Sequence, residues 1–278
     1  VMQQLWRQHH GPTPPRRVLD MAAAPGSKTT QLAAWRQGQG LVLANEYAAS
    51  RIKALYTNLS RCGVANAMLS HGDGRRLGTA LPGWFDAILL DAPCSGEGTV
   101  RKDASALAGW SLAAIEELAS LQQQLLDSAF AALRPGGLLV YSTCSLNGRE
   151  NDEQLAAFMA RHGHEAELHD LRQLWPTLTP LHHPDGHLQI WPHRYDAEGF
   201  FVAALSKKGD APGADFSSSP LPARFPFQPW PAKEQQRWQQ WLAGREAFLP
   251  PGHIDEAALY GRNLISGMLA THPGEDTP

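Results

Sequence analysis

Short apolar runs alternate with longer segments of helical periodicity along the first 160 residues. Five apolar runs predict strands, at residues 17–21, 40–45, 67–70, 85–90 and 138–142. Apolar residues spaced three or four apart predict the intervening helices, at residues 29–35, 48–62, 112–133 and 150–161. Because these strands are nearly continuous in apolar residues, we expect an α/β fold whose mostly parallel sheet is covered by helices on both faces.

The pattern changes after residue 162. Residues 188–191 and 199–205 predict a terminal hairpin that adds an antiparallel edge strand to the sheet. Residues 206–231 shift to Ser, Pro, Gly and Ala and predict a linker. We therefore expect a main domain over residues 1–205 and an incomplete C-terminal region over residues 232–278. Residues 1–9 resemble the body of a helix without a cap, so a segment before them is expected to be missing.

Composition narrows the possible environments and partners. The chain has 278 residues, of which 43% are hydrophobic, enough for a substantial core. Its net charge of -3 argues against bulk electrostatic capture of nucleic acid, so any such contact must be local. Three cysteines do not form a disulfide framework, and no long apolar run opens the chain. We expect a cytoplasmic protein without a membrane span.

A loop of small residues follows the first predicted strand and leads into a helix. It comprises Ala22, Ala23, Ala24, Pro25, Gly26, Ser27 and Lys28. Small side chains let a ligand approach the backbone, and free N–H groups at a helix start can face an anion. The loop contains neither of the common glycine-rich phosphate motifs, and a tight turn without a ligand is the alternative.

Acidic residues stand at or just after the ends of four successive predicted strands: Asp20, Glu46, Asp73 and Asp91. A single carboxylate in such a place is more often a cap or a solvated charge, but four are less easily a coincidence. In nucleotide-binding α/β sheets the acid after the second strand, here Glu46, holds the ribose hydroxyls. The pattern predicts a nucleotide-type cofactor at this edge.

Two cysteines follow the fourth and fifth apolar runs, Cys94 and Cys144. A thiolate can add to carbon 6 of a pyrimidine and make carbon 5 nucleophilic, which divides one difficult step into two easier ones. The attacking thiol needs a neighbour that lowers its pKa, for which Lys28 and the helix N-terminus after Ser145 are candidates. Cys62 is expected to be an ordinary structural cysteine.

These motifs carry a family resemblance. The loop from Ala22 to Thr29, the run Asp91-Ala92-Pro93-Cys94-Ser95-Gly96 and the run Ser142-Thr143-Cys144-Ser145, with Asn147, Glu150 and Asn151, are similar to motifs of the RNA 5-methylcytosine methyltransferases of the Sun/Fmu type. The similarity spans about residues 1–205. It implies a Rossmann-like class I S-adenosylmethionine-dependent methyltransferase fold over these residues, with the cofactor bound by the loop 22–28, Glu46, Asp73 and Asp91.

The resemblance also implies roles and a substrate. Cys144 would be the nucleophile, Cys94 would assist release of the product, and Asp91 would hydrogen-bond the cytosine edge. The expected partner is RNA, namely 16S ribosomal RNA or the small ribosomal subunit, and the expected state is a monomer. Alternatives are a tRNA or DNA cytosine-5 methyltransferase, since the DNA enzymes attack with the Pro-Cys thiol, and a non-catalytic RNA-binding assembly factor.

Some further polar and aromatic residues are of types that can bind nucleic acids or metals. Arg101 and Lys102 suit contact with RNA phosphates, although a solvated pair is equally compatible with the sequence. Trp110, Trp191 and Phe200 are expected to pack in the core or hairpin rather than to stack on bases. There is no Cys-x-x-Cys pair, and the histidines are scattered outside the motif loops, so no metal site is expected.

Overall fold

The computed structural model describes residues 1–36, 40–174 and 185–209. The chain divides into two compact units. Unit 1 combines Val1–Thr13 with Asp73–Ser217, and unit 2 combines Pro14–Gly72 with Ser218–Pro278. The expected region 232–278 and most of the expected linker lie outside the described residues.

Unit 2 is built on three parallel strands. They are β1 (Arg17–Asp20), β2 (Leu41–Glu46) and β3 (Ala67–His71), with β2 paired to both of the others. Helix α2 (Ser27–Trp35) follows β1, and α3 (Ala49–Arg61) follows β2. Every residue of β1 and β2 is buried, as continuous apolar strands predict for a sheet covered on both faces.

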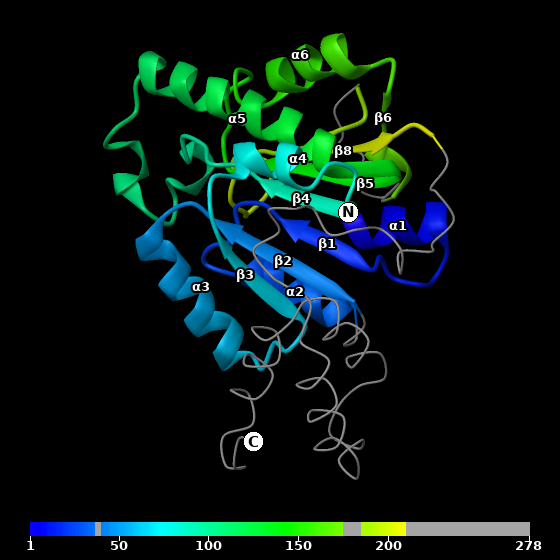
Figure 1. The fold of residues 1–278 in the computed structure, drawn as a ribbon. Coiled ribbons are helices and arrows are strands. Elements are labelled where there is room, and N and C mark those ends of the chain that lie inside the picture. Colours follow the sequence, from blue (N-terminus) through cyan, green and yellow to red (C-terminus); the bar gives the residue numbers. More distant parts are fainter. Residues whose placement is uncertain (37–39, 175–184, 210–278) are drawn as a thin grey trace, which may run out of the picture. The chain divides into compact units, whose positions relative to one another are not determined.

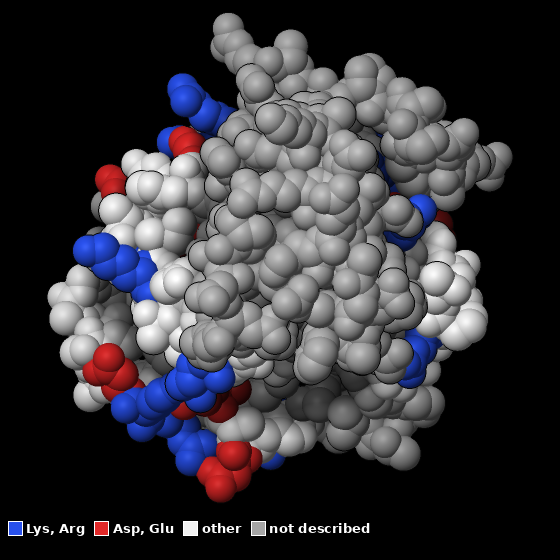
Figure 2. Space-filling model, turned by 60° about the horizontal axis from the view of Figure 1, so that its bottom comes forward, with Lys and Arg blue, Asp and Glu red and all other residues white. Residues whose placement is uncertain are grey.

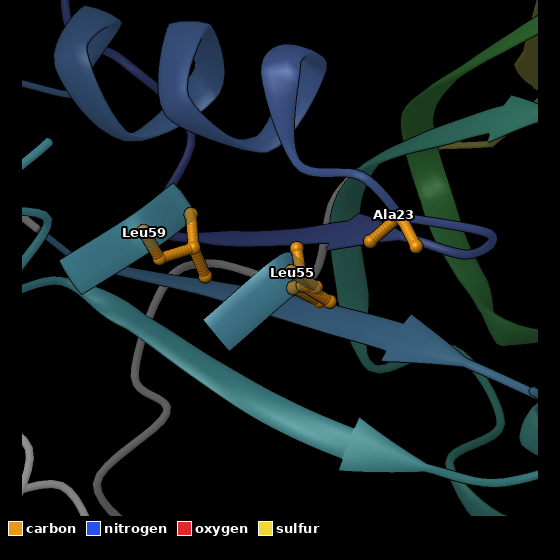
Figure 3. Packing of buried hydrophobic residues seen from close by; sticks show 5 residues of the cluster. Ala23, Leu55 and Leu59 are labelled. Atoms are coloured by element: carbon orange, nitrogen blue, oxygen red, sulfur yellow. The ribbon is translucent and has the colours of Figure 1, made fainter. Parts of the chain in front are cut away.

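Helix α3 packs its apolar face against the loop that follows β1. Leu55 and Leu59 are buried in one cluster with Ala23, Ala24 and Ala44. Figure 3 shows Leu55 and Leu59 directed from α3 toward the strands and Ala23. Because Leu55 and Leu59 are four residues apart, they lie on one face of the helix. This packing anchors the loop predicted to bind a cofactor.

Unit 1 contains the remaining elements. In chain order they are α1 (Met2–His10), η1 (Gly74–Arg76), α4 (Leu77–Ala80), β4 (Phe85–Asp91), η2 (Glu97–Thr99), η3 (Ala104–Leu107), α5 (Leu112–Ala132), β5 (Leu133–Thr143), α6 (Asp152–His162), β6 (Ala166–Leu168), η4 (Leu171–Gln173), β7 (Leu188–Ile190) and β8 (Phe200–Lys207). Figure 1 shows α5 and α6 on one side of β4 and β5, and α1 on the other. The Ser111 hydroxyl caps α5 by accepting a hydrogen bond from the Ala114 nitrogen.

The strands of unit 1 form a mixed arrangement. β4 and β5 are parallel, and β8 runs antiparallel to β5. The predicted hairpin of β7 and β8 is confirmed, but the prediction that it supplies an edge strand is wrong for β8. On the side of β8 away from β5, the first residues of β8 pair with β7 and its last residues pair with β6. The three-residue β6 was too short to be recognised in the sequence.

The predicted α/β fold class is confirmed by the parallel strands and by the helices that alternate with them. Within the part of the chain that the structure describes, no helix is long and apolar enough to cross a membrane. On the face shown in Figure 2, the visible basic and acidic side chains are interspersed. This distribution agrees with the near-neutral net charge of the sequence.

Candidate active site

The carboxyl ends of β4 and β5 lie side by side in unit 1. Asp91, the last residue of β4, is in register with Ser142 of β5, and the Ser142 hydroxyl donates a 2.7 Å hydrogen bond to the Asp91 carboxylate. Parallel strands end at the same edge of a sheet, so the segments that follow both strands begin together. Those segments carry the two cysteines.

The two thiols are in direct contact. The sulfur atoms of Cys94 and Cys144 are 2.9 Å apart; both cysteines are half-buried, and they are not joined by a disulfide. The backbone nitrogen of Cys144 also donates a hydrogen bond to the Cys94 sulfur at 3.3 Å. The structure therefore brings together the two cysteines predicted to take part in the reaction, although they are 50 positions apart in the sequence.

The contact changes the acidity of Cys94. Its hydrogen bond with the Cys144 side chain raises the pKa of the Cys94 thiol, and burial and the nearby charge of Cys144 raise it further. Cys94 therefore keeps its proton at neutral pH. As a protonated thiol it can donate a hydrogen bond to the Cys144 sulfur.

A buried carboxylate holds the two cysteine loops together. Glu150 is fully buried, and its two oxygens accept four hydrogen bonds. The donors are the Ser95 backbone nitrogen at 2.9 Å, the Gln122 amide at 2.8 Å, the Ser145 hydroxyl at 2.8 Å and the Asn147 amide at 2.7 Å. Ser95 and Ser145 each follow a cysteine directly. The Glu150 side chain thus fixes one thiol loop relative to the other.

A second carboxylate, Glu97, makes a similar link nearer the surface. It accepts hydrogen bonds from the Trp110 indole at 2.6 Å and from the Leu146 nitrogen at 3.1 Å. Burial tends to raise the pKa of the Glu97 carboxyl, but its hydrogen bonds, that of Trp110 first, outweigh burial and hold the pKa below its usual range. Glu97 is therefore ionised at neutral pH.

Two glycines allow the backbone of these loops to approach closely. The Gly98 nitrogen donates to the Cys144 carbonyl at 2.8 Å, and the Gly199 nitrogen donates to the Gly98 carbonyl at 2.9 Å. A Cβ atom at Gly98 would lie 2.3 Å from the Gly199 oxygen and 2.7 Å from the Cys144 oxygen. The chain can hold the Cys144 loop in this place because residue 98 has no side chain.

Helix α6 begins farther from Cys144 than the sequence suggested. It starts at Asp152 rather than at residue 150, and Asp152 and Glu153 occupy its first turn. Asn151 is the N-cap residue, but its side chain makes no capping bond: it accepts from the Thr143 hydroxyl and donates to the Ser145 carbonyl. Asn147 is the residue that accepts from the Glu150 nitrogen, at 3.0 Å. These two amides therefore shape the turn after Cys144.

The loop of small residues in unit 2 serves packing as well as access. Ala23, Ala24 and Gly26 are buried, whereas Pro25 and Ser27 are exposed. Gly26 has φ 108°, a left-handed conformation that favours glycine, and a Cβ there would lie 2.9 Å from a methyl carbon of Leu55. Access for a ligand can therefore explain the small side chains of only part of the loop. The buried residues Ala23, Ala24 and Gly26 are small because α3 packs against them. Ala22 and Lys28 are half-buried.

Glu46 ties this loop to the end of β2. It is buried, and its carboxylate accepts hydrogen bonds from the Ala24 nitrogen at 3.2 Å and the Ala48 nitrogen at 2.8 Å. The Arg51 guanidinium lies 3.9 Å from Glu46 and donates to the Ala24 carbonyl at 2.6 Å. The backbone around Ala24 is therefore fixed beside an acidic group at the end of β2.

The remaining predicted site residues differ in their surroundings. Asp73 accepts a hydrogen bond from the backbone nitrogen of Arg75 and several from its guanidinium. The Arg75 side chain holds the pKa of Asp73 below its usual range. Asp73, Asp91, Cys94 and Cys144 belong to unit 1, and the loop 22–28 with Glu46 belongs to unit 2.

Glu97 and Gln122 are parts of this site that were not predicted from the sequence. A signal was present for each: Glu97 is a charged residue between two glycines in a cysteine loop, and Gln122 is a polar residue on the buried face of α5.

Among the residues that the structure describes, no group of three or more His, Cys, Asp or Glu side chains could hold a metal ion.

Comparison with known proteins places the chain in a family. Residues 9–206 match the family described as 16S rRNA methyltransferase RsmB/F. Two relatives are named ribosomal RNA small subunit methyltransferase F. The relative from Cronobacter sakazakii is 53% identical over 80% of this chain and 46% of its own length. The relative from Aeromonas salmonicida is 48% identical over 88% of this chain and 50% of its own length. The chain spans about half the length of these curated relatives.

Solved structures agree with this assignment. NSun6 from Pyrococcus horikoshii, crystallised with SFG, is 31% identical with a TM-score of 0.63 over 76% of this chain and 52% of its own. A methyltransferase homologue from Pyrococcus horikoshii is 32% identical with a TM-score of 0.59 over 71% of this chain and 63% of its own. The resemblance to the Sun/Fmu type, and within it to RsmF, is confirmed. The chain belongs to the 16S rRNA methyltransferase RsmB/F family.

Proposed function

We propose that this protein methylates carbon 5 of a cytosine in 16S ribosomal RNA, with S-adenosylmethionine as methyl donor. The observation that carries the proposal is the contact of 2.9 Å between the Cys94 and Cys144 sulfurs at the carboxyl ends of two parallel strands. Family membership and the names of the relatives support the choice of substrate.

Cys144 is the nucleophile of the proposed reaction. Its sulfur adds to carbon 6 of the cytosine, the double bond between carbons 5 and 6 opens, and carbon 5 becomes nucleophilic. Carbon 5 would then take the methyl group of S-adenosylmethionine, with cleavage of the methyl–sulfur bond and release of S-adenosylhomocysteine. A base then takes the proton from carbon 5, the double bond re-forms, and the bond from carbon 6 to sulfur breaks. Asp91, at the end of β4, hydrogen-bonds the cytosine edge and favours its electrophilic form.

Cys94 assists the last step. Because its raised pKa keeps it protonated, its S–H can donate to the Cys144 sulfur as negative charge returns to that atom. This interaction stabilises Cys144 as a leaving group. An anionic Cys94 would repel the same charge, so the protonated state suits release better than attack.

The residues in the cofactor region fit a nucleoside with a charged amino-acid tail. Glu46 presents a carboxylate at the end of β2, where ribose hydroxyls are held in nucleotide-binding α/β sheets. Ala22, Pro25, Ser27 and Lys28 leave the loop partly accessible. Asp73 and Asp91 are included in the proposed cofactor site on the family resemblance alone. When bound, S-adenosylmethionine supplies the methyl group. Lys28 is proposed to contribute positive charge to the site.

The test separates the two cysteines. Cys94→Ala, Cys144→Ala and the double variant are incubated with S-adenosylmethionine and 16S ribosomal RNA, and a covalent protein–RNA band is sought on a denaturing gel. We expect the band to accumulate with Cys94→Ala and to vanish with the double variant. An adduct that requires Cys94 would instead indicate the mechanism of DNA methyltransferases.

The substrate is tested with the unmodified protein. Methyl transfer to 16S ribosomal RNA or to the small subunit, but not to tRNA or DNA, is the expected result. Transfer to tRNA or DNA alone would overturn the substrate. Absence of transfer to any of them, together with retained RNA binding, would favour a non-catalytic assembly factor.

The same proposal includes the protein's state and location. It acts as a cytoplasmic monomer without a metal, and residues 1–205 form its catalytic domain. Light scattering after gel filtration measures the mass in solution, and methyl transfer in the presence of EDTA tests metal independence. A dimer, or loss of activity with EDTA, would contradict these statements.

A further inference from the structure

The segment that leads from the Cys94 loop to α5 exposes apolar side chains. Trp110 is 48% exposed, Leu107 41% and Leu112 67%. The expectation that Trp110 packs in the core is therefore wrong, because the chain between η3 and α5 runs over the surface. An exposed indole this close to a candidate active site is a feature of the kind that marks binding surfaces.

The Trp110 ring is held in place by a chain of hydrogen bonds that ends beside Cys144. Its indole nitrogen donates to one oxygen of Glu97 at 2.6 Å, and the other oxygen accepts from the Leu146 nitrogen at 3.1 Å. Leu146 is two residues after Cys144. A single ionised carboxylate thus separates the exposed ring from the turn that carries the nucleophile.

Basic side chains lie in the same segment. Arg101 and Lys102 are exposed, and Arg101 reaches the turn before β8 through a 2.6 Å contact with Asp196. An exposed aromatic ring in a segment that also carries cationic residues suits a single-stranded nucleic acid, whose bases stack on the ring while its phosphates meet the cations. The exposed indole and the basic residues of the same segment favour such a strand over an apolar protein partner.

We propose that Trp110 is a stacking platform for an unpaired nucleobase that flanks the target cytosine. The inference rests on the proposed function, because the strand must deliver a cytosine to Cys144. Extrusion of a target base leaves its neighbours without a stacking partner, and enzymes that act on extruded bases contact the flanking nucleotides. The Trp110 ring replaces the lost partner, and Glu97 sets its orientation relative to the Cys144 loop.

Two substitutions separate stacking from the Glu97 hydrogen bond. Trp110→Leu removes the aromatic ring, whereas Trp110→Phe keeps a ring and loses the N–H donor. Tyr56→Leu is the matched control, because Tyr56 is an aromatic residue of α3 that is 56% exposed. Steady-state methyl transfer gives kcat and KM for RNA and for S-adenosylmethionine, and fluorescence anisotropy gives RNA affinity directly.

We expect Trp110→Leu to raise KM for RNA by about 5- to 150-fold, with KM for S-adenosylmethionine unchanged. Trp110→Phe should recover most of this loss, and Tyr56→Leu should match the unmodified protein. Thermal unfolding of each variant shows whether a loss of RNA binding is due to misfolding. If Trp110→Leu is misfolded, the comparison of Trp110→Phe with the unmodified protein tests the inference.

The alternatives are distinguishable. If Trp110→Leu binds and methylates RNA as the unmodified protein does, the stacking inference fails while the proposed function stands. If Trp110→Phe is as impaired as Trp110→Leu, the hydrogen bond to Glu97 is what matters and stacking is overturned. If the unmodified protein neither binds nor methylates RNA, both proposals fail.

Discussion

The Glu150 carboxylate lies 2.9 Å from the backbone nitrogen of Ser95, so one buried side chain connects the loop after β5 with the loop after β4. The same carboxylate accepts from the Ser145 hydroxyl at 2.8 Å. The relative position of Cys94 and Cys144 therefore depends on a residue that need not contact a substrate. Glu150 acts as a positioning residue.

Glu150→Ala is expected to unfold more easily and to lose methyl transfer. Removal of the carboxylate takes an acceptor from four donors, two buried and two partly buried, at a cost of about 1–3 kcal/mol or more in the free energy of unfolding. Glu150→Gln should also be impaired, because its NH₂ group would face donors. Denaturant unfolding and methyl transfer measure both effects. Glu153→Gln, at an exposed acid of α6, is the control, and an equal loss there would contradict the prediction.

Gly98→Ala is expected to displace the Cys144 loop. The new methyl group would lie 2.3 Å from the Gly199 oxygen, so the backbone must shift, at about 1–3 kcal/mol. Gly109→Ala is a matched control in the same connection, since a Cβ there meets nothing within 4 Å. Thermal unfolding and adduct formation should change for the first variant alone. Normal adduct formation by Gly98→Ala would show that the close approach is dispensable.

The raised pKa of Cys94 predicts how its reactivity varies with pH. A raised pKa means a smaller thiolate fraction at any given pH, so alkylation of Cys94 by iodoacetamide should be slower than that of exposed Cys62 and should rise only at alkaline pH. Cys144→Ala removes the main cause of the shift, so the Cys94 profile should move to lower pH. Mass spectrometry of the alkylated peptides measures each site. An unchanged profile in Cys144→Ala would refute the assigned cause.

Glu46→Gln is expected to weaken cofactor binding. In the proposed site the Glu46 carboxylate accepts hydrogen bonds from the cofactor. Loss of its negative charge costs about 1.5–3 kcal/mol of binding free energy, which corresponds to roughly 10- to 150-fold in Kd for S-adenosylmethionine. Calorimetric titration measures the change, and thermal unfolding reports any damage to the loop that Glu46 holds through Ala24. Lys53→Met, at an exposed position of α3, is the control. Unchanged affinity in Glu46→Gln would remove Glu46 from the cofactor site.

Much of the fold could be predicted because the local signals agree with the tertiary outcome. The apolar run at 85–90 became β4, and the periodic segment 112–133 became α5 almost residue for residue. The errors fall where local signals are weak or are overridden. Residues 133–137 join β5, although Pro135 and the glycines after it were expected to lie between helix and strand. The pairing partners of β8 depend on the remote β6, which no local pattern announced.

The sequence by itself determined the order of strands and helices, the placement of Cys94 and Cys144 after successive strands, and the family motifs around them. These properties follow from periodicity and local chemistry, which neighbouring residues decide. Only the tertiary structure decided that the two sulfurs touch, that Glu97 and Glu150 link their loops, and that Trp110 faces solvent. Such relationships join residues up to about 55 positions apart, and they depend on how strands align and how closely loops pack, which periodicity does not encode.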